Sequence, residues 1–215
     1  MSAELILYTN PMSRGRIARW MLEEVGQPYR VEYLDFGTTM RSAEFLEINP
    51  MGKVPTLRHG EAIVTEAAAI CAYLAAAFPE AGLEADRTTP AYAAYLRWLF
   101  FAAGPVEAAV SAKALGLLAP PDKRATVGYG DFASVMDTLE YAIAGKEYIA
   151  GDRFSAADVY VGAHIGWGLQ FGTIEPRPAF VAYRDRLEAR PAAQRAKALD
   201  DEAMQRMLQE QQQQQ

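Results

Sequence analysis

The sequence predicts two folded parts, an α/β domain followed by an all-helical domain. Up to about residue 78, short apolar runs with strand character alternate with segments whose apolar residues recur at helical spacing. After Gly82 no strand-like run of convincing length returns, and Ala, Leu and Glu, which favour helices, dominate. The 215 residues are enough for two small domains, each with a core of its own.

The first part of the chain predicts elements in the order β-α-β-α-β-β-α. Leu5 to Thr9 is an apolar run that ends at Asn10-Pro11, which is typical of a strand followed by a turn. Apolar residues from Ile17 to Val25 recur three and four positions apart, and Gly26 follows at the C-cap position. Strands that alternate with helices and then form a hairpin at His59-Gly60 indicate a sheet with parallel and antiparallel pairs. The expected strands are 5–9, 29–36, 52–57 and 62–64, and the expected helices are 14–25, 42–48 and 66–78.

The second part of the chain predicts helices alone. Thr89-Pro90 starts a long helix, with a bend expected at Gly104-Pro105. Another helix is expected to start at Pro120-Pro121-Asp122, and Ser155-Ala156-Ala157-Asp158 has the spacing of a capping box. Further helices are expected over 159–171, 176–190 and 191–207. The predicted organisation is a first domain over 1–80, a linker over 81–88, a helical domain over 89–208 and a disordered Gln-rich tail over 209–215.

Composition excludes several classes of protein. The net charge of −6, the pI near 5.1 and the lack of a Lys or Arg run argue against nucleic acid or an anionic membrane surface as the partner. The first residues do not resemble a signal sequence, and the apolar run from Ala67 to Phe78 is too short to span a bilayer, so a cytoplasmic protein is expected. Cys71 is the single cysteine, which excludes an internal disulfide, a CxxC redox pair and a cysteine-built zinc site. Neither His59 nor His164 adds a metal site, so we expect no metal.

Four segments, taken together and in order, resemble the cytosolic, bacterial-type glutathione transferase superfamily. They are Leu7-Tyr8-Thr9-Asn10-Pro11-Met12-Ser13-Arg14-Gly15-Arg16, Asn49-Pro50-Met51-Gly52-Lys53-Val54-Pro55-Thr56-Leu57, Thr65-Glu66-Ala67-Ala68-Ala69-Ile70 and Ser155-Ala156-Ala157-Asp158. The likeness covers nearly the whole chain up to the glutamine tail. It implies a thioredoxin-like N-terminal domain that binds glutathione, an all-helical C-terminal domain, and a homodimer.

The resemblance makes glutathione the co-substrate and implies where it binds. A cis bond at Val54-Pro55 would turn the Val54 amide and carbonyl outward, where they pair with the cysteinyl backbone of glutathione as a short strand. Glu66 is implied to bind the γ-glutamyl ammonium, although a carboxylate at a helix start also complements the helix dipole. Ala67 stands where many members carry a serine, so backbone amides would hold the γ-glutamyl carboxylate. Arg41 and Lys53 are either the partners of the glycine carboxylate or ordinary solvated charges.

The family places its thiol-activating residue between the first strand and the first helix. A thiol has a reference pKa of about 8.5, and the nucleophile is the thiolate, so the enzyme must favour the anion. Ser13 is the first candidate for the hydrogen-bond donor, although it stands equally where a plain helix N-cap belongs. Asn10 and Thr9 are its rivals, because some bacterial members resembling this chain use Thr and Asn at the strand end.

A second substrate, a small hydrophobic electrophile, is implied to lie against the helical domain. The candidates for contact with it are aromatic, apolar and acidic residues that also suit an ordinary core: Met12, Phe101, Gly104, Glu107 and Trp167. One rival function is a glutathione-dependent disulfide reductase in which Thr9 and Asn10 hold a sulfur of bound glutathione. Another rival is a non-catalytic binding module with this fold, and the alanine at position 67 leans slightly that way.

Overall fold

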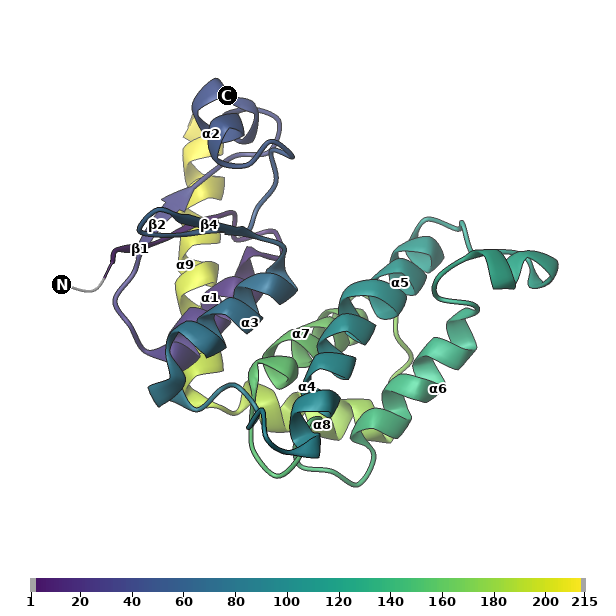
Figure 1. The fold of residues 1–215 in the computed structure, drawn as a ribbon. Helices are drawn as coiled ribbons and strands as arrows, with labels where there is room; N and C mark the ends of the chain where they lie inside the picture. Colours follow the sequence, from purple (N-terminus) through teal and green to yellow (C-terminus); the bar gives the residue numbers. More distant parts are fainter. Residues whose placement is uncertain (1–2, 214–215) are drawn as a thin grey trace. The chain divides into compact units, whose positions relative to one another are not determined.

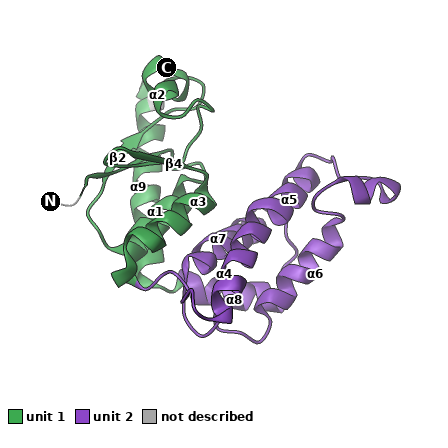
Figure 2. Cartoon of the chain, in the orientation of Figure 1, with its two compact units in different colours: residues 1–81, 189–215 green, residues 82–188 purple. Residues whose placement is uncertain are grey.

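The computed structural model describes residues 3–213 of the chain, which form two compact units (Figure 2). The first unit contains the chain up to Ala81 together with the chain from Ala189 onward, and the second contains Gly82–Glu188. The predicted division into an α/β part and a helical part is confirmed. The last helix was expected in the helical domain over 89–208, whereas it belongs to the first unit.

The first unit is built on a four-stranded mixed sheet with the strand order β2-β1-β3-β4. Its strands are β1 (Leu5–Thr9), β2 (Arg30–Tyr33), β3 (Thr56–His59) and β4 (Ala62–Thr65). β1 pairs in parallel with β2 and antiparallel with β3, and the β3–β4 hairpin closes the edge. The strand expected from residue 52 begins only at Thr56, because Pro55 has no N–H to donate to a ladder.

Helices cover this sheet, and apolar side chains fill the space between them. The helices are α1 (Gly15–Val25), α2 (Ala43–Ile48), α3 (Ala67–Ala77) and α9 (Pro191–Gln213), with a short 3-10 turn at Thr39–Arg41 and another at Pro79–Ala81. α1 and α3 lie side by side, and α9 runs along α1 (Figure 1). Leu7, Met21 and Leu57 are fully buried, so β1 and α1 share one core.

A buried ion pair joins α9 to α1 within the first unit. The Nε of Arg19 donates to Oδ1 of Asp200 at 2.7 Å, and the side chains are 3% and 1% exposed. Arg19 also donates to the Tyr33 hydroxyl at 2.9 Å. At the end of α1, Arg190 binds both carboxylate oxygens of Glu24 at 2.7 and 2.8 Å. These contacts explain why the segment after residue 188 leaves the helical unit, where the sequence analysis had placed it.

The glutamine-rich end of the chain is helical as far as the structure describes it. α9 continues to Gln213, whereas a disordered tail was expected from residue 209. Glutamine has a good helix propensity, so a helix already started by residues 191–208 extends into it at little cost. Residues 214–215 of the expected tail lie outside the described residues.

The second unit consists of helices packed around an apolar core. They are α4 (Pro90–Phe101), a π-helical turn (Ala102–Val106), α5 (Glu107–Ala114), a 3-10 turn (Pro121–Thr126), α6 (Phe132–Ile143), α7 (Ala156–Gln170) and α8 (Pro178–Glu188). The predicted bend falls in the π-helical turn, where Pro105 cannot donate a backbone hydrogen bond. The predicted capping box at the start of α7 is also present, with Ser155 and Asp158 exchanging hydrogen bonds.

The prediction that a helix starts at Pro120-Pro121-Asp122 is wrong. That segment makes only the 3-10 turn, and the following helix, α6, begins at Phe132. The Asp131 carboxylate accepts the Ser134 amide at 2.9 Å and the Ser134 hydroxyl at 2.8 Å, which gives α6 its N-cap. The glycines at positions 128 and 130 separate the two segments and favour a break over a continuous helix.

Removal of the Asp200 carboxylate should destabilise the protein strongly. Asp200→Ala leaves the Arg19 guanidinium buried without its anion, so we expect the free energy of unfolding to fall by about 3–5 kcal/mol, measured by urea denaturation. Arg206→Gln, which removes an exposed pair on the same helix, should change it by no more than about 0.5 kcal/mol. Equal losses in the two variants would contradict this account of α9.

Candidate functional site

A cleft of about 370 Å³ in the first unit collects five of the residues chosen from the sequence. Three loops line it: the β1–α1 turn, the segment between β2 and α2, and the turn before β3. The predicted residues in its lining are Met12, Ser13, Arg41, Lys53 and Val54, and the others are Arg14, Phe36, Gly37, Met40 and Gly52. Phe36, Gly37 and Met40 were missed, because no motif marks the segment that supplies them.

The Ser13 hydroxyl stands at the mouth of α1 and is hydrogen-bonded within its own turn. It donates to the Asn10 carbonyl at 2.7 Å and accepts the Gly15 amide at 2.9 Å. Arg14, with helical dihedral angles, occupies the formal N-cap position that we expected for Ser13. Ser13 therefore lies one residue before the N-cap. Its hydroxyl oxygen accepts the Gly15 amide, one of the amides at the helix start that has no partner within the helix. Rotation about its side-chain bond frees the hydroxyl proton for a ligand in the cleft.

Asn10 and Thr9 lie beneath the cleft and do not line it. Both are buried, and the Asn10 amide donates to the Leu34 carbonyl at 2.8 Å while its oxygen accepts the Met12 amide at 2.9 Å. The Thr9 hydroxyl oxygen has no hydrogen-bond partner among the described residues. Asn10 therefore braces the turn that carries Ser13 through its side-chain hydrogen bonds, and Thr9 does not.

Gly15 is required by the close approach of Thr9. A Cβ at position 15 would overlap the Thr9 hydroxyl oxygen and touch the Ser13 oxygen. The start of α1 can therefore sit directly on the end of β1 only with glycine at this position. The position of the Ser13 turn follows from this contact.

Gly15→Ala should lower the free energy of unfolding by about 1–3 kcal/mol, because the added methyl group forces the two elements apart. Urea denaturation measures the loss, and Gly128→Ala, whose Cβ meets nothing within 4 Å, is the matched control. Thr9→Ala in the Gly15→Ala background should recover part of the loss, with a coupling of at least about 1 kcal/mol. Strict additivity of the two substitutions would contradict the assigned contact.

The turn before β3 is held by one buried asparagine, Asn49, to which the sequence alone gave no role. Asn49 donates to the Lys53 carbonyl at 2.8 Å and to the Thr56 hydroxyl at 3.0 Å, and its oxygen accepts the Met51 amide at 3.1 Å. The Val54-Pro55 bond is cis, as the resemblance implied. Asn49 thereby fixes both ends of the segment that presents Val54 to the cleft.

Three cationic side chains, Arg14, Arg41 and Lys53, give the cleft a positive lining. Arg41 donates to the Met51 carbonyl at 3.3 Å, which links the second loop to the third. Gly52 has a φ of 58°, and a Cβ there would meet the Met40 carbonyl at 2.7 Å and the Arg41 guanidinium at 2.9 Å. The glycine lets these loops approach closely, and the resulting site suits an anionic ligand.

Glu66 and Ala67 lie where β4 passes into α3, outside the residues that line the cleft. Glu66 has a φ of 65° and a ψ of 118°, in a region that side chains other than glycine rarely adopt. Such strain costs about 1–3 kcal/mol and gathers at binding sites, and here it accompanies an exposed carboxylate. Ala67 is buried in the first turn of α3, and Pro55 is buried behind Val54.

Four of the residues proposed to contact the electrophile belong to the second unit, while Met12, which is 48% exposed, belongs to the first. Phe101 ends α4 and Gly104 lies in the π-helical turn. Glu107 starts α5, and its carboxylate lies 3.4 Å from the Tyr160 hydroxyl and 3.9 Å from Nε2 of the buried His164. Trp167 is half-buried on α7.

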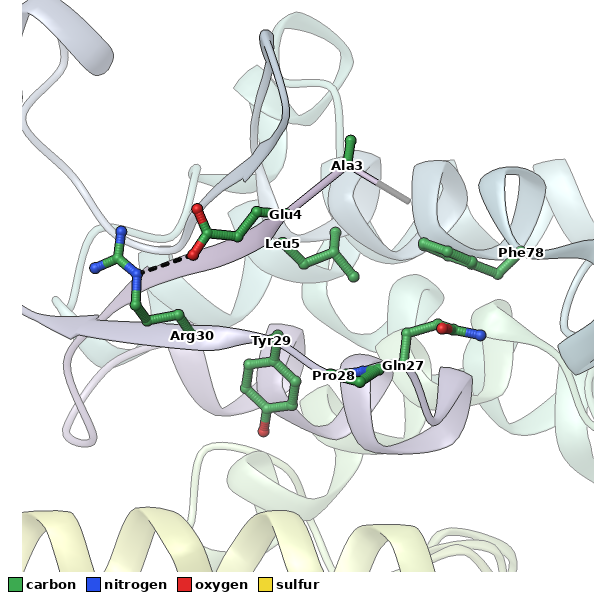
Figure 3. A pocket seen from close by; sticks show the side chains of 8 residues that line it. All are labelled: Ala3, Glu4, Leu5, Gln27, Pro28, Tyr29, Arg30 and Phe78. Atoms are coloured by element: carbon green, nitrogen blue, oxygen red, sulfur yellow. Dashed lines mark hydrogen bonds and ion pairs between the residues drawn. The ribbon is translucent and has the colours of Figure 1, made fainter. Parts of the chain in front are cut away.

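A second pocket in the first unit, of about 320 Å³, holds none of the residues chosen from the sequence. It lies at the far end of the sheet, between residues 3–5, residues 27–30 and Phe78 (Figure 3). Its charged side chains, Glu4 and Arg30, are paired with each other at 3.3 Å (Figure 3). The cleft beside Ser13 is therefore the better candidate site.

The described part of the chain offers neither a metal-binding cluster nor a helix that could span a membrane. No group of three or more His, Cys, Asp or Glu side chains among residues 3–213 is arranged to hold a metal ion. No helix in that range combines the length and apolar composition that crossing a membrane requires.

Comparison with known proteins points to one family. Residues 3–76 match "Glutathione S-transferase, N-terminal domain" and residues 127–191 match "Glutathione S-transferase, C-terminal domain". Glutathione S-transferase GstB of Escherichia coli is 30% identical over 185 residues, which is 81% of this chain and 88% of that protein. A glutathione transferase structure from Methylococcus capsulatus has a TM-score of 0.76 at 30% identity, over 92% of this chain and 98% of that one. A homologue from Sulfitobacter with bound glutathione has a TM-score of 0.74 at 28% identity, over 94% and 99% of the two chains.

Proposed function

The chain belongs to the glutathione S-transferase family, and we propose that its cleft beside Ser13 binds glutathione and activates the thiol for attack on a small hydrophobic electrophile. The observation that carries the proposal is the composition of the cleft. A serine hydroxyl at a helix start, three cationic side chains and the backbone beside Val54 line the same space. Glutathione needs these three kinds of group for its thiol, its carboxylates and its peptide backbone.

Each part of glutathione has a proposed partner in the first unit. The cysteinyl backbone pairs with the Val54 amide and carbonyl, which the following Pro55 leaves outside the β3 ladder. Arg41 and Lys53 take the glycine carboxylate. The γ-glutamyl ammonium binds Glu66, and the first amides of α3, beginning at Ala67, take the γ-glutamyl carboxylate.

The hydroxyl of Ser13 is sufficient for most of the activation. Lowering a thiol pKa by two units requires about 2.7 kcal/mol. A hydrogen bond to a charged group contributes about 1.5–3 kcal/mol, and the start of α1 adds about 0.3–1 kcal/mol. Arg14, which also lines the cleft, adds positive charge beside the developing anion.

The reaction is nucleophilic attack by the bound thiolate. Its sulfur lone pair forms a bond to an electrophilic carbon, and the leaving group departs with the bonding electrons, or a conjugated acceptor takes a proton from solvent. Binding both substrates in one site supplies the orientation. Met12, Phe101, Gly104, Glu107 and Trp167 remain the proposed contacts of the electrophile, and the homodimer implied by the resemblance belongs to the same proposal.

The two rival functions are less well supported by the site. A disulfide reductase built on Thr9 and Asn10 requires their side chains to reach a bound sulfur, and both are buried beneath the turn. A non-catalytic module is favoured only by Ala67, while the hydroxyl, the cations and the Val54 segment that glutathione needs are all retained. We therefore favour the transferase, with Ser13 as the donor.

The test is a pH titration of the glutathione thiolate by its ultraviolet absorbance, on the protein and on Ser13→Ala. We expect the pKa of bound glutathione to rise by about 1–2 units in Ser13→Ala, because the lost donor contributes about 1.5–3 kcal/mol. Turnover at neutral pH should fall about 10-fold to 100-fold with glutathione affinity nearly unchanged. Ser13→Thr keeps the hydroxyl and is the matched control.

An unchanged thiol pKa and unchanged turnover in Ser13→Ala would move the role to Asn10 or Thr9. Calorimetric titration with reduced and oxidised glutathione separates the rival functions. A clear preference for the oxidised form would favour the disulfide reductase, and no binding of either form would leave the fold without the proposed function.

A further inference from the structure

Arg16, in the first turn of α1, joins the Ser13 turn to the last helix of the chain. Its Nε donates to the Pro11 carbonyl at 2.5 Å, and its Nη1 donates to Oδ1 of Asp201 on α9 at 2.8 Å. Its Nη2 lies 3.9 Å from the Met204 sulfur, one turn further along α9. One planar guanidinium therefore joins the β1–α1 turn to residues of α9 that follow Arg16 by 185 and 188 positions in sequence.

The geometry of this link is set by the ion pair next to it. Arg19 is three residues after Arg16 on α1, and its partner Asp200 precedes Asp201 on α9. The two helices lie against each other in this region (Figure 1). The Arg19–Asp200 pair is buried, whereas the Arg16 and Asp201 side chains are 23% and 35% exposed. The buried pair fixes the position of α1 against α9. At that position Arg16 reaches both Asp201 and the Pro11 carbonyl.

Asp201 is held as an anion in this position. Burial acts to raise the pKa of its carboxyl, but hydrogen bonds from Arg16 and Lys197 outweigh it and lower the pKa below the ordinary value. Lys197, one turn earlier on α9, donates to the second carboxylate oxygen at 3.0 Å. The carboxylate is thus oriented by two cations and presents a fixed acceptor to Arg16.

We propose that Arg16 and Asp201 are positioning residues through which α9 holds the Asn10-to-Ser13 turn, and with it the Ser13 hydroxyl, in place. This inference rests on the proposed role of Ser13 in activating glutathione. Because proline has no N–H, the carbonyl is the one polar backbone group of Pro11. Arg16 donates to that carbonyl. Without Asp201 the guanidinium loses the anchor that directs its Nε to that carbonyl, and the turn samples more conformations.

The experiment compares Asp201→Asn with Arg195→Gln, which removes another α9-to-α1 pair, that of Arg195 with Glu23 at 3.1 Å, without touching the turn. The first readout is hydrogen exchange of the Ser13 and Gly15 amides in the ligand-free protein, which are bonded to the Asn10 carbonyl and the Ser13 hydroxyl. We expect Asp201→Asn to speed their exchange about threefold to tenfold, as the loss of a partly exposed pair allows, and Arg195→Gln to leave it unchanged.

The second readout is the thiolate titration of bound glutathione. Asp201→Asn should raise its pKa by about 0.5 to 1 unit and lower turnover in proportion, with the melting temperature of the protein close to that of Arg195→Gln. Arg16→Lys, which keeps the charge but not the fork of donors, should behave like Asp201→Asn. The double variant Arg16→Lys with Asp201→Asn should be no worse than either single variant.

Unchanged exchange of the Ser13 and Gly15 amides in Asp201→Asn would overturn the inference, and so would equal changes in Arg195→Gln. The two readouts distinguish a failure of this inference from a failure of the proposed function. If the unaltered protein gives no thiolate signal with glutathione, the proposed function fails, whereas the exchange measurement still decides whether α9 holds the turn.

Discussion

The guanidinium of Arg19 and the carboxylate of Asp200 meet at 2.7 Å, away from solvent, and the position of α1 depends on that contact. A buried charge without its partner is costly, so α1 and α9 have one favourable alignment. On its other side α1 packs apolar side chains, such as Met21, against the sheet and α3. The helix is therefore held from two sides by different forces, and the turn that leads into it carries Met12, Ser13 and Arg14, which form one wall of the cleft.

The candidate site is assembled from loops, each braced from beneath. Asn10 ties the β1–α1 turn to the Leu34 carbonyl, and Asn49 ties the turn before β3 to Lys53 and Thr56. In both cases a buried amide side chain donates to a backbone carbonyl and accepts a backbone amide, and Asn49 also donates to the Thr56 hydroxyl. The side chains exposed to the cleft are then free to meet a ligand, while the backbone that carries them is fixed. This division of roles separates Ser13 from Thr9 and Asn10.

Much of the fold could be predicted from the sequence, because local patterns encode it. The apolar periodicity from Ile17 to Val25 and the capping box at Ser155 identify helices without reference to distant residues. The break before α6 was missed, because Pro120 and Pro121 are suited to start either a helix or a 3-10 turn. The docking of α9 was also missed, because Arg19 and Asp200 are 181 positions apart and a single sequence does not show that they pair.

Most of the cleft residues that the sequence predicted lie in a motif, and Arg41 is the exception. Ser13 and Val54 lie in segments with a recognisable order and spacing, and both line the cleft. Phe36 and Met40 line it too, yet they come from a connecting segment whose composition says nothing about binding. Whether Ser13 or Asn10 faces a ligand depends on side-chain direction at the end of β1, and the sequence does not show that the Asn10 side chain binds the Leu34 carbonyl and the Met12 amide.

The central claim, that Ser13 activates glutathione in this cleft, is tested most directly by a crystal structure of the protein with reduced glutathione. The account predicts that the cysteinyl sulfur lies within hydrogen-bond distance of the Ser13 Oγ, that this hydroxyl has left the Asn10 carbonyl, and that the cysteinyl backbone pairs with Val54. A sulfur bound by Thr9 or Asn10, with the Ser13 hydroxyl still donating to the Asn10 carbonyl, would contradict it.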